Sequence, residues 1–548
     1  MAHALAGKPV REQDIIDVQT IVDAYFDNVP DMTNPTQLVS FGTSGHRGTS
    51  VDGTFTDLHV AAITQAICDG RKQFGATGPI FVGQDTHALS QPALVTVLEV
   101  LAGNGVTAMV DCDMAFVPTP SVSRAIIRYN EEHDDKADGI IITPSHNPPD
   151  NGGIKYNTII GGPADTVVTK WIEMRANEYL TAYCESEDFK RISIDNIEPT
   201  AQVPYDYKGL YVEELGDVIN MEAIKAAGPK VLVDTLGGSG ASYWNAIKER
   251  YGLDLTIIHD DYDPTFSFMT YDHDGKVRMD CSSTYVMASV INRIGDFDLA
   301  VGNDPDYDRY GIVVSSGLIS ANTFLTLAAR YLFTTRGWKN KGVGKTVVCT
   351  TMIDKWAADA ETSVFEVPVG FKYFSQLLFD GAIGIGGEES AGASFLKKDG
   401  TVWTTDKDGM IMALLSMEIM AVMGKSALKM ADESLEEFGN PSFGRIDAPC
   451  KKEQKQILKQ MSAELITATT VDGDPITNIR TTSLYNDMPI DGVRVETDKG
   501  WFVARPSGTE DLYKIYGESY KGDLGLVALL TAGEEIVNAA LNGTIETE

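Results

Sequence analysis

Short apolar runs with strand character alternate with helical stretches along this chain from about residue 55. Residues 80–83, 107–110 and 139–142 are strand-like, and helical spacing of apolar residues separates them over residues 93–102 and 121–129. This alternation predicts an α/β domain, with helices covering both faces of its sheet.

The same pattern begins again twice. Residues 231–234 lead through the glycine-rich turn 237–240 into a helix, and the strand-like residues 346–349 open a third unit. The last part of the chain starts with a helical stretch at 451–466 and continues as short strands, which indicates a smaller α+β unit. Since 548 residues are too many for one hydrophobic core, three or four domains are expected. Candidate linkers are residues 197–207, 315–322 and 439–450.

The net charge of the chain is −33, from 45 basic and 78 acidic residues. This surplus argues against nucleic acid or an anionic membrane as a partner, so an anionic ligand would need a local cluster of basic groups. The six cysteines lack CxxC or CxxH spacing, which is typical of reduced cytosolic thiols. The first residues lack the apolar core of a signal peptide, and the apolar run 411–423 is short and contains Glu418. We therefore expect a cytoplasmic protein without a membrane partner.

The strand-like run 139–142 ends in a turn that carries one serine. Ser145 is followed directly by His146 and Asn147, and two prolines behind them disfavour helix. A serine in a stiff turn at a strand end is well placed for chemistry. Taken alone, an ordinary polar turn is an equal alternative.

Three aspartates stand at alternate positions between two apolar runs. In an extended chain, the spacing of Asp304, Asp306 and Asp308 would point their carboxylates to one side. Because like charges repel and all the ligand atoms are oxygen, Mg²⁺ is the expected partner, with coordination positions left for a phosphoryl oxygen and water. Arg309 follows directly and could hold a substrate phosphate. An acidic surface turn is the alternative, and a calcium loop is excluded because its sixth position is Arg309 instead of glycine.

A loop near the C-terminus has the composition of a phosphate cradle. Arg505, Ser507, Gly508 and Thr509 combine a guanidinium, two hydroxyls and a glycine N–H that can approach an anion closely. An ordinary glycine-containing hairpin fits these residues equally well.

Two other loops could contact a sugar phosphate. Glu388 and Ser390 could bond neighbouring sugar hydroxyls, although a plain turn fits their spacing better, and Lys372 lies upstream as a cation. Residues 43–48 form a basic, glycine-containing loop with Ser44 and Arg47, for which a tight turn is the alternative. With the serine and the metal site, these loops fit phosphoryl transfer through Ser145.

Five segments occur together in one order: TSGHRG (43–48), TPSHNP (143–148), DPDYDR (304–309), GEESAG (387–392) and RPSGTE (505–510). This set resembles the α-D-phosphohexomutase superfamily over nearly the whole chain. Within it, GEES and residues 369–372 resemble the phosphoglucomutase branch, and the length and loop sequences resemble its bacterial members.

The resemblance implies a fold of four domains around a central cleft. Three related mixed α/β domains would be followed by a smaller C-terminal α+β domain like the TATA-binding protein, with boundaries at 1–205, 206–318, 319–442 and 443–548. The implied activity interconverts glucose 1-phosphate and glucose 6-phosphate through a phosphoserine and glucose 1,6-bisphosphate, with one Mg²⁺ per chain.

The resemblance also implies a role for each loop. Ser145 would carry the phosphoryl group and bind Mg²⁺ with the three aspartates. Lys155 would be the general base, and Arg47 and His146 would support proton transfer. The implied substrate contacts are Ser44, Arg309, Lys372, Glu388, Ser390, Arg505, Ser507, Gly508 and Thr509.

The sequence departs from the family pattern at two places. Asp511 stands where a proline is usual after the last motif, and His87 stands where an arginine is frequent, so a contact by that arginine is not carried over. A mutase for mannose or glucosamine phosphates is the rival enzyme, and a non-catalytic sugar-phosphate-binding protein is the rival from another class. The sequence leaves open whether the protein is a monomer or a homodimer.

Overall fold

The computed structural model describes residues 2–42, 45–183, 189–506 and 512–545. The chain divides into two compact units, each of which is described by itself. The first unit comprises residues 1–320, 374–381 and 390–428, and the second comprises residues 321–373, 382–389 and 429–548.

The first sheet is mixed, and its parallel strands are buried on both faces. Its strand order is β1 (His46–Thr49), β5 (Asn151–Asn157), β4 (Asp138–Ile142), β2 (Ile80–Gln84), β3 (Ala108–Asp111) and β6 (Gln202–Tyr205). Ile80 and Val82 point into one hydrophobic core, whereas Phe81 between them points into a second core on the other face. The associated helices are α1 (Val18–Asp27), α2 (Asp57–Gly70), α3 (Ser90–Gly103), α4 (Thr119–Glu132) and α5 (Thr166–Tyr183).

The second sheet carries the acidic turn between its antiparallel strands β9 and β10. Its order is β11 (Gly317–Leu318), β10 (Tyr310–Val314), β9 (Leu299–Asn303), β7 (Val231–Asp234) and β8 (Leu255–Ile258). The neighbouring helices are α6 (Tyr207–Val218), α7 (Met221–Ala227), α8 (Ala241–Tyr251), α9 (Ala288–Ile291) and the apolar α13 (Gly409–Met423). Helix α13 packs on β9, β10 and α7 and is buried from its start to Ile419.

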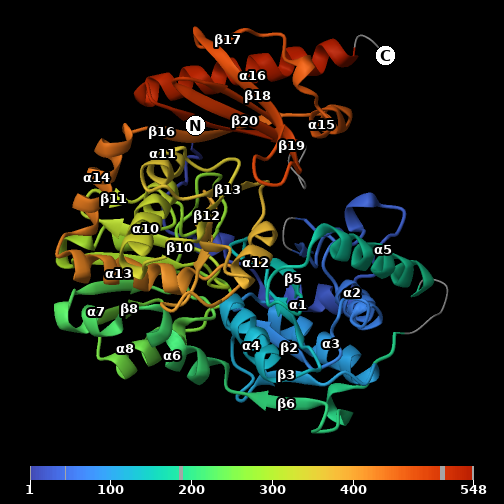
Figure 1. Ribbon diagram of the computed structural model, residues 1–548. Coiled ribbons are helices and arrows are strands. Elements are labelled where there is room, and N and C mark those ends of the chain that lie inside the picture. Colours follow the sequence, from blue (N-terminus) through green and yellow to red (C-terminus); the bar gives the residue numbers. More distant parts are fainter. Residues whose placement is uncertain (1, 43–44, 184–188, 507–511, 546–548) are drawn as a thin grey trace. The chain divides into compact units, whose positions relative to one another are not determined.

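The second unit contains a parallel sheet and an antiparallel sheet. The parallel sheet includes β13 (Val364–Val367), β12 (Gly342–Thr346) and β14 (Ile383–Gly387), with α10 (Ala321–Arg336) and α11 (Met352–Asp359). The antiparallel order is β16 (Ser442–Pro449), β21 (Leu512–Ser519), β20 (Gly500–Pro506), β19 (Pro489–Thr497), β18 (Asp474–Thr482) and β17 (Thr470–Val471). Helices α15 (Lys452–Lys459) and α16 (Gly522–Ile545) accompany this sheet, and α16 lies along it (Figure 1).

The remaining elements are short or join these sheets. They are β15 (Ala393–Phe395), α12 (Lys372–Phe379), α14 (Ala427–Phe438) and the 3₁₀ helices Glu12–Asp14, Pro35–Gln37, Ile194–Asn196, Ile294–Asp296 and Ala463–Leu465.

Among the described residues, α16 is the single unbroken helix long and apolar enough to cross a membrane, over Gly522–Asn542. The pair α13 and α14, bent by 87°, would count as a second only if it formed one span. Leu529, Leu530, Val537 and Leu541 of α16 are buried in the core beside the antiparallel sheet, which gives this helix a role in the fold.

The structure confirms the prediction of mixed α/β domains followed by a smaller α+β part, and corrects several details. The strand expected at 346–349 is β12, which ends at Thr346, because residues 347–349 turn away from the sheet. The expected linkers 197–207 and 439–450 contain β6 and β16, which pair with β3 and β21. The helix expected over 451–466 ends at Lys459.

Candidate active site

Ser145 lies in the turn that joins β4 to β5. Its φ of +60° places it in the left-handed region, where a residue with a side chain is uncommon and costs conformational energy. The Ser145 N–H donates to Thr143 Oγ1 at 2.7 Å, which fixes the turn. The serine is thereby held in a strained conformation at the end of a buried strand, as expected for a reactive group.

A buried ion pair from the end of β2 supports this turn. Asp85 accepts hydrogen bonds from Thr143 Oγ1 at 2.6 Å and from His87 Nδ1 at 2.8 Å, and His87 Nε2 lies 3.0 Å from the Asn147 carbonyl oxygen. Burial alone would raise the pKa of Asp85, but His87 and the hydroxyls of Ser90 and Thr143 together outweigh burial and lower that pKa. The histidine that replaces the usual arginine therefore contacts the serine turn.

The three aspartates converge because the chain turns tightly between β9 and β10. Residues 304–309 are not extended, which corrects the expected geometry, and Tyr307 has a φ of +63°. All three carboxylates are buried, and oxygens from Asp304, Asp306 and Asp308 lie within 4.8 Å of one another.

This acidic cluster has the properties of a cation site. Burial, together with Asp306 and Asp308, raises the pKa of Asp304 well above its usual range. Asp306 Oδ1 and Asp308 Oδ1 are buried without a hydrogen-bond partner in the described part of the chain. Buried carboxylate oxygens of this kind need a positive partner, and all-oxygen ligands suit a hard divalent cation.

The serine reaches this cluster directly. Ser145 Oγ lies 2.9 Å from Asp304 Oδ2 and 3.3 Å from His146 Nδ1. A phosphoryl group on this oxygen would therefore lie beside the carboxylates.

Two buried lysines partly neutralise the cluster. Lys155 Nζ, from β5, lies 2.6 Å from Asp306 Oδ2 and 3.1 Å from Asp308 Oδ2, and Lys407 Nζ lies 2.9 Å from Asp308 Oδ2. Burial opposes the charge of Lys155, but Asp306 and Asp308 outweigh it and raise the pKa of this lysine. Lys155 is therefore an ammonium in this arrangement.

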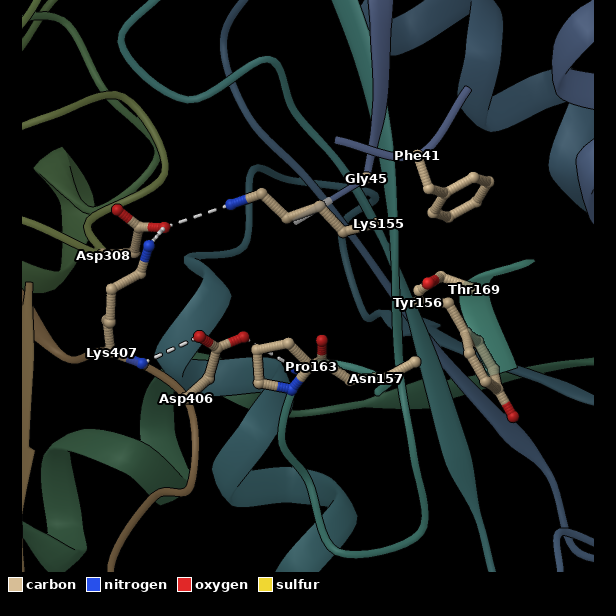
Figure 2. A pocket seen from close by; sticks show the side chains of 11 residues that line it. Phe41, Gly45, Lys155, Tyr156, Asn157, Pro163, Thr169, Asp308, Asp406 and Lys407 are labelled. Atoms are coloured by element: carbon tan, nitrogen blue, oxygen red, sulfur yellow. Dashed lines mark hydrogen bonds and ion pairs between the residues drawn. The ribbon is translucent and has the colours of Figure 1, made fainter. Parts of the chain in front are cut away.

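Lys155 and Lys407 reach Asp308 from two directions beside a pocket (Figure 2). Its lining includes Phe41, Gly45 and Asn157. Gly45 has a φ of +134°, and a Cβ there would meet the Ile154 carbonyl oxygen at 2.5 Å, so glycine allows its loop to lie against β5. Sequence reasoning missed Lys407, although the charged run Asp406–Lys407–Asp408 before the most apolar helix was a usable signal.

Arg309, His146 and Arg47 flank the serine turn. Arg309 Nη1 and His146 Nε2 lie 3.4 Å and 3.9 Å from the same oxygen, Asp280 Oδ2. Burial and the Arg309 cation hold the pKa of His146 well below its usual range, so its imidazole is neutral near pH 7. Arg47 Nη1 lies 3.5 Å from Asn147 Oδ1. The structure thus brings together Ser145 and the residues expected to support transfer at it.

The remaining predicted substrate contacts are distributed over the two compact units of the chain. Lys372 begins α12, Glu388 follows β14 and is buried, and Arg505 lies in β20 with its Nε donating to the Ile490 carbonyl oxygen at 3.1 Å. These three belong to the second unit, and Ser390 to the first. Ser44, Ser507, Gly508 and Thr509 lie outside the described residues.

Four family models match this chain in succession. They describe phosphoglucomutase/phosphomannomutase α/β/α domains I, II and III at residues 38–182, 210–317 and 320–438, and the C-terminal domain at residues 447–524.

Individual relatives agree with these matches. A phosphoglucomutase of Komagataeibacter xylinus is 46% identical over 539 residues, covering 97% of each chain. Phosphoglucomutase 1 of Saccharomyces cerevisiae is 26% identical over 526 residues, covering 88% of each chain. The crystal structure of pp63/parafusin, a phosphoglucomutase of Paramecium, in its open form matches with a TM-score of 0.71 at 19% identity, covering 94% of this chain and 96% of that one. The chain therefore belongs to the phosphoglucomutase/phosphomannomutase family.

Proposed function

We propose that this protein is a phosphoglucomutase, which interconverts glucose 1-phosphate and glucose 6-phosphate through a phosphoserine at Ser145 and glucose 1,6-bisphosphate. The observation that carries the proposal is the 2.9 Å approach of Ser145 Oγ to Asp304 within the three-carboxylate cluster. The 46% identity to a phosphoglucomutase over nearly the whole chain supports the choice of glucose phosphates.

Asp304, Asp306 and Asp308 would hold Mg²⁺ together with the phosphoryl oxygens of Ser145. Asp306 Oδ1 and Asp308 Oδ1, which are buried and have no hydrogen-bond partner among the described residues, support this assignment. When bound, the ion would offset the negative charge of the phosphoryl group during transfer. The backbone N–H of Arg309 donates to Asp304 Oδ1 at 2.9 Å, and its guanidinium would add a positive charge for the substrate phosphate.

Lys155 would exchange the proton of the attacking sugar hydroxyl. A general base must be neutral when it accepts a proton, whereas the two carboxylates keep Lys155 charged in the present arrangement. Its role as a base therefore requires Lys155 to give up part of this ion pairing. Neutral His146, 3.3 Å from Ser145 Oγ, and the nearby Arg47 would assist at the serine.

The bound sugar must reverse its orientation between the two half-reactions, because one serine serves both the 1- and the 6-position. A distal clamp that recognises only the phosphate suits this requirement, and Arg505 with Ser507, Gly508 and Thr509 would provide it. Glu388 and Ser390 would bind sugar hydroxyls, and Lys372 and Ser44 would contact substrate.

A coupled assay tests the proposal directly. The purified protein is given glucose 1-phosphate, Mg²⁺ and a trace of glucose 1,6-bisphosphate, and glucose 6-phosphate is followed with its dehydrogenase. We expect a higher kcat/KM for glucose 1-phosphate than for mannose 1-phosphate or glucosamine 1-phosphate. A higher value for either competitor would assign a sister activity, and binding without turnover would indicate a sugar-phosphate-binding protein.

We also propose that the enzyme works in the cytoplasm as a monomer or homodimer. The strongly negative charge and the packing of α16 in a core beside a sheet support a protein free of anionic membranes. Light scattering of the purified protein would separate the two oligomeric states.

A further inference from the structure

The long connection between β8 and α9 brings an unassigned carboxylate to the serine turn. Met279 N–H donates to the His146 carbonyl oxygen at 3.1 Å. The next residue, Asp280, directs Oδ2 toward Arg309 Nη1 at 3.4 Å and His146 Nε2 at 3.9 Å. Ser282 fixes the other oxygen of Asp280 through its N–H at 3.0 Å and its hydroxyl at 2.6 Å. One anchored carboxylate therefore contacts both side chains that flank the reacting serine.

Two carboxylates, those of Asp280 and Asp308, compete for the guanidinium of Arg309. The guanidinium Nε of Arg309 lies 3.8 Å from Asp308 Oδ1, one of the three clustered carboxylates. Without a counter-charge on its other side, Arg309 would be drawn onto that cluster, where it would compete with the cation and turn away from a phosphate. Asp280 supplies the counter-charge, since its oxygen is the nearer of the two carboxylates.

Asp280 stands at the end of a hairpin, residues 269–281, which we call the arm. Tyr271 and Val277 form an antiparallel bridge in it, and the Asp272 N–H donates to the Lys276 carbonyl oxygen at 2.8 Å. Gly275 makes the reversal with a φ of +79°. The base of the arm is buried in the core of the second sheet through Met269 and Met279, whereas its tip at His273 and Asp274 is exposed, so the strap is a second support beside that core.

The N-terminal residues 2–14, which we call the strap, pair with the first limb of the arm, residues 269–273. Pro9 bridges Thr270 in antiparallel fashion, the Gly7 N–H donates to the Tyr271 carbonyl oxygen at 2.8 Å, and the Tyr271 N–H donates to the Lys8 carbonyl oxygen at 2.9 Å. At the far end, the His3 N–H donates to the His273 carbonyl oxygen at 2.8 Å. The strap thus adds an extra strand-like edge to the arm.

The phenol of Tyr271 fastens the strap where it leaves the arm. Its oxygen accepts the Arg11 N–H at 3.0 Å and donates to Asp14 Oδ2. Four residues after Asp14, α1 begins, and its residues Ile21 and Tyr25 are buried in the core of the first sheet. The strap therefore ties the arm to the domain that carries Ser145.

We propose that the strap is a positioning element for phosphoryl transfer: by bracing the arm it holds Asp280, which orients Arg309 and His146 beside Ser145. The proposal rests on the proposed mutase function. Neither the strap nor Asp280 touches the reacting atoms, so both act through Arg309 and His146. A small displacement of such groups can lower kcat/KM by as much as about a hundredfold.

The test combines three variants, a double variant that carries both the deletion and Asp280→Asn, and a matched control. One variant lacks residues 2–11, the second is Asp280→Asn, and the third, Tyr271→Phe, removes only the hydroxyl that fastens the strap. Lys8→Ala is the control, because the Lys8 side chain is exposed while its backbone pairs with the arm. The measurements are kcat and KM for glucose 1-phosphate, and native-state hydrogen exchange of the Met279 amide.

We expect Asp280→Asn and the strap deletion each to raise KM about tenfold with a smaller change in kcat, because Arg309 contacts phosphate in the bound states. Loss of folded enzyme alone would instead lower kcat at constant KM. The kcat/KM of the double variant should be no more than about twofold below that of Asp280→Asn, since the strap acts through that carboxylate. Tyr271→Phe should have a weaker effect in the same direction, and Lys8→Ala should match the wild type.

Hydrogen exchange separates this proposal from the proposed function. The Met279 amide should exchange about tenfold faster without the strap, and at the wild-type rate in Lys8→Ala. The proposal would be overturned if the Met279 amide exchanged at the wild-type rate in the deletion variant. It would also be overturned if the losses in kcat/KM from the deletion and from Asp280→Asn multiplied in the double variant. If the wild type lacked mutase turnover, the proposed function would fall, and the exchange result would still decide whether the strap holds the arm.

Discussion

Replacing Lys155 with methionine separates the proton chemistry of the site from its metal binding. The change keeps a long side chain but removes the ammonium that lies 2.6 Å from Asp306 and 3.1 Å from Asp308. The side chain of Lys155 is only 5% exposed, and those of the two aspartates are exposed by 1% or less, so solvent screens these pairs weakly. Removing one partner of such a buried pair typically destabilises a protein by about 3–5 kcal/mol.

We expect Lys155→Met to lose mutase activity by about 10²–10⁴-fold, the usual contribution of a general acid or base. Its melting temperature without metal should fall below that of the wild type, because the clustered carboxylates lose a counter-charge. Mg²⁺ should narrow this gap, since ligand at a hundredfold excess over its Kd stabilises by about 2.7 kcal/mol and the variant should bind the ion more tightly.

The assay pairs the coupled activity measurement with thermal unfolding at increasing Mg²⁺. Lys170→Met is the matched control, because Lys170 forms an exposed pair with Glu173 at 2.7 Å, and its loss should cost about 1 kcal/mol or less. Wild-type turnover in Lys155→Met would refute its role in proton transfer. A gap in melting temperature that widens with Mg²⁺ would refute the assignment of the carboxylates to the ion.

Three other perturbations follow from the structure. Asp306→Asn should weaken Mg²⁺ dependence and turnover while the fold survives, and an unchanged metal titration curve would mean that Asp306 is not a ligand. Arg505→Ala should raise KM for glucose 1-phosphate and glucose 6-phosphate by a similar factor of about 10–100, because a charge-assisted hydrogen bond worth about 1.5–3 kcal/mol is lost. The variant should also release more glucose 1,6-bisphosphate. An effect on only one of the two sugar phosphates would disprove a shared clamp. Burial lowers the pKa of His59 to about 3 and also lowers that of His46, whose ring stacks on it at 5.3 Å. Because both folded pKa values lie below the usual 6.5, the stability that comes from keeping these histidines neutral is complete above about pH 6.5 and falls with the pH below it. For His59 this loss continues toward pH 3, at no more than about 1.4 kcal/mol per pH unit. Urea unfolding between pH 7 and 4 should show this slope, and His59→Gln should flatten it; an equal slope in the variant would contradict the assignment.

The sequence predicted the loops of the site because each loop carries its chemistry within a few adjacent residues. Ser145 and His146 share one turn, and the three aspartates share another. Apolar runs predicted β2, β3, β4 and β7, because buried parallel strands are apolar on both faces. The strand β12 was misplaced because residues 347–348 are apolar for another reason, since they pack in a core with residues of the antiparallel sheet.

Residues that support the site from distant parts of the chain could not be found in this way. Asp85 is 58 positions from Thr143, and Arg309 is 29 positions from Asp280. Lys407 reaches Asp308 only because α13 packs on β9 and β10. These contacts arise from tertiary packing, which brings together residues that lie far apart in the chain. Of these residues, Lys407 alone carried a local signal, the charged run 406–408 before α13. The convergence of the aspartates was predicted correctly, but it results from a tight turn with a left-handed Tyr307 and not from an extended strand.

The phosphoryl state of Ser145 tests the account most directly. Intact-mass measurement of the wild type and of Ser145→Ala, each incubated with glucose 1,6-bisphosphate and Mg²⁺, should show one added phosphoryl group on the wild type and none on the variant, which should also lack mutase activity. A wild type that never gains this mass, or a Ser145→Ala enzyme with full turnover, would contradict the phosphoserine mechanism.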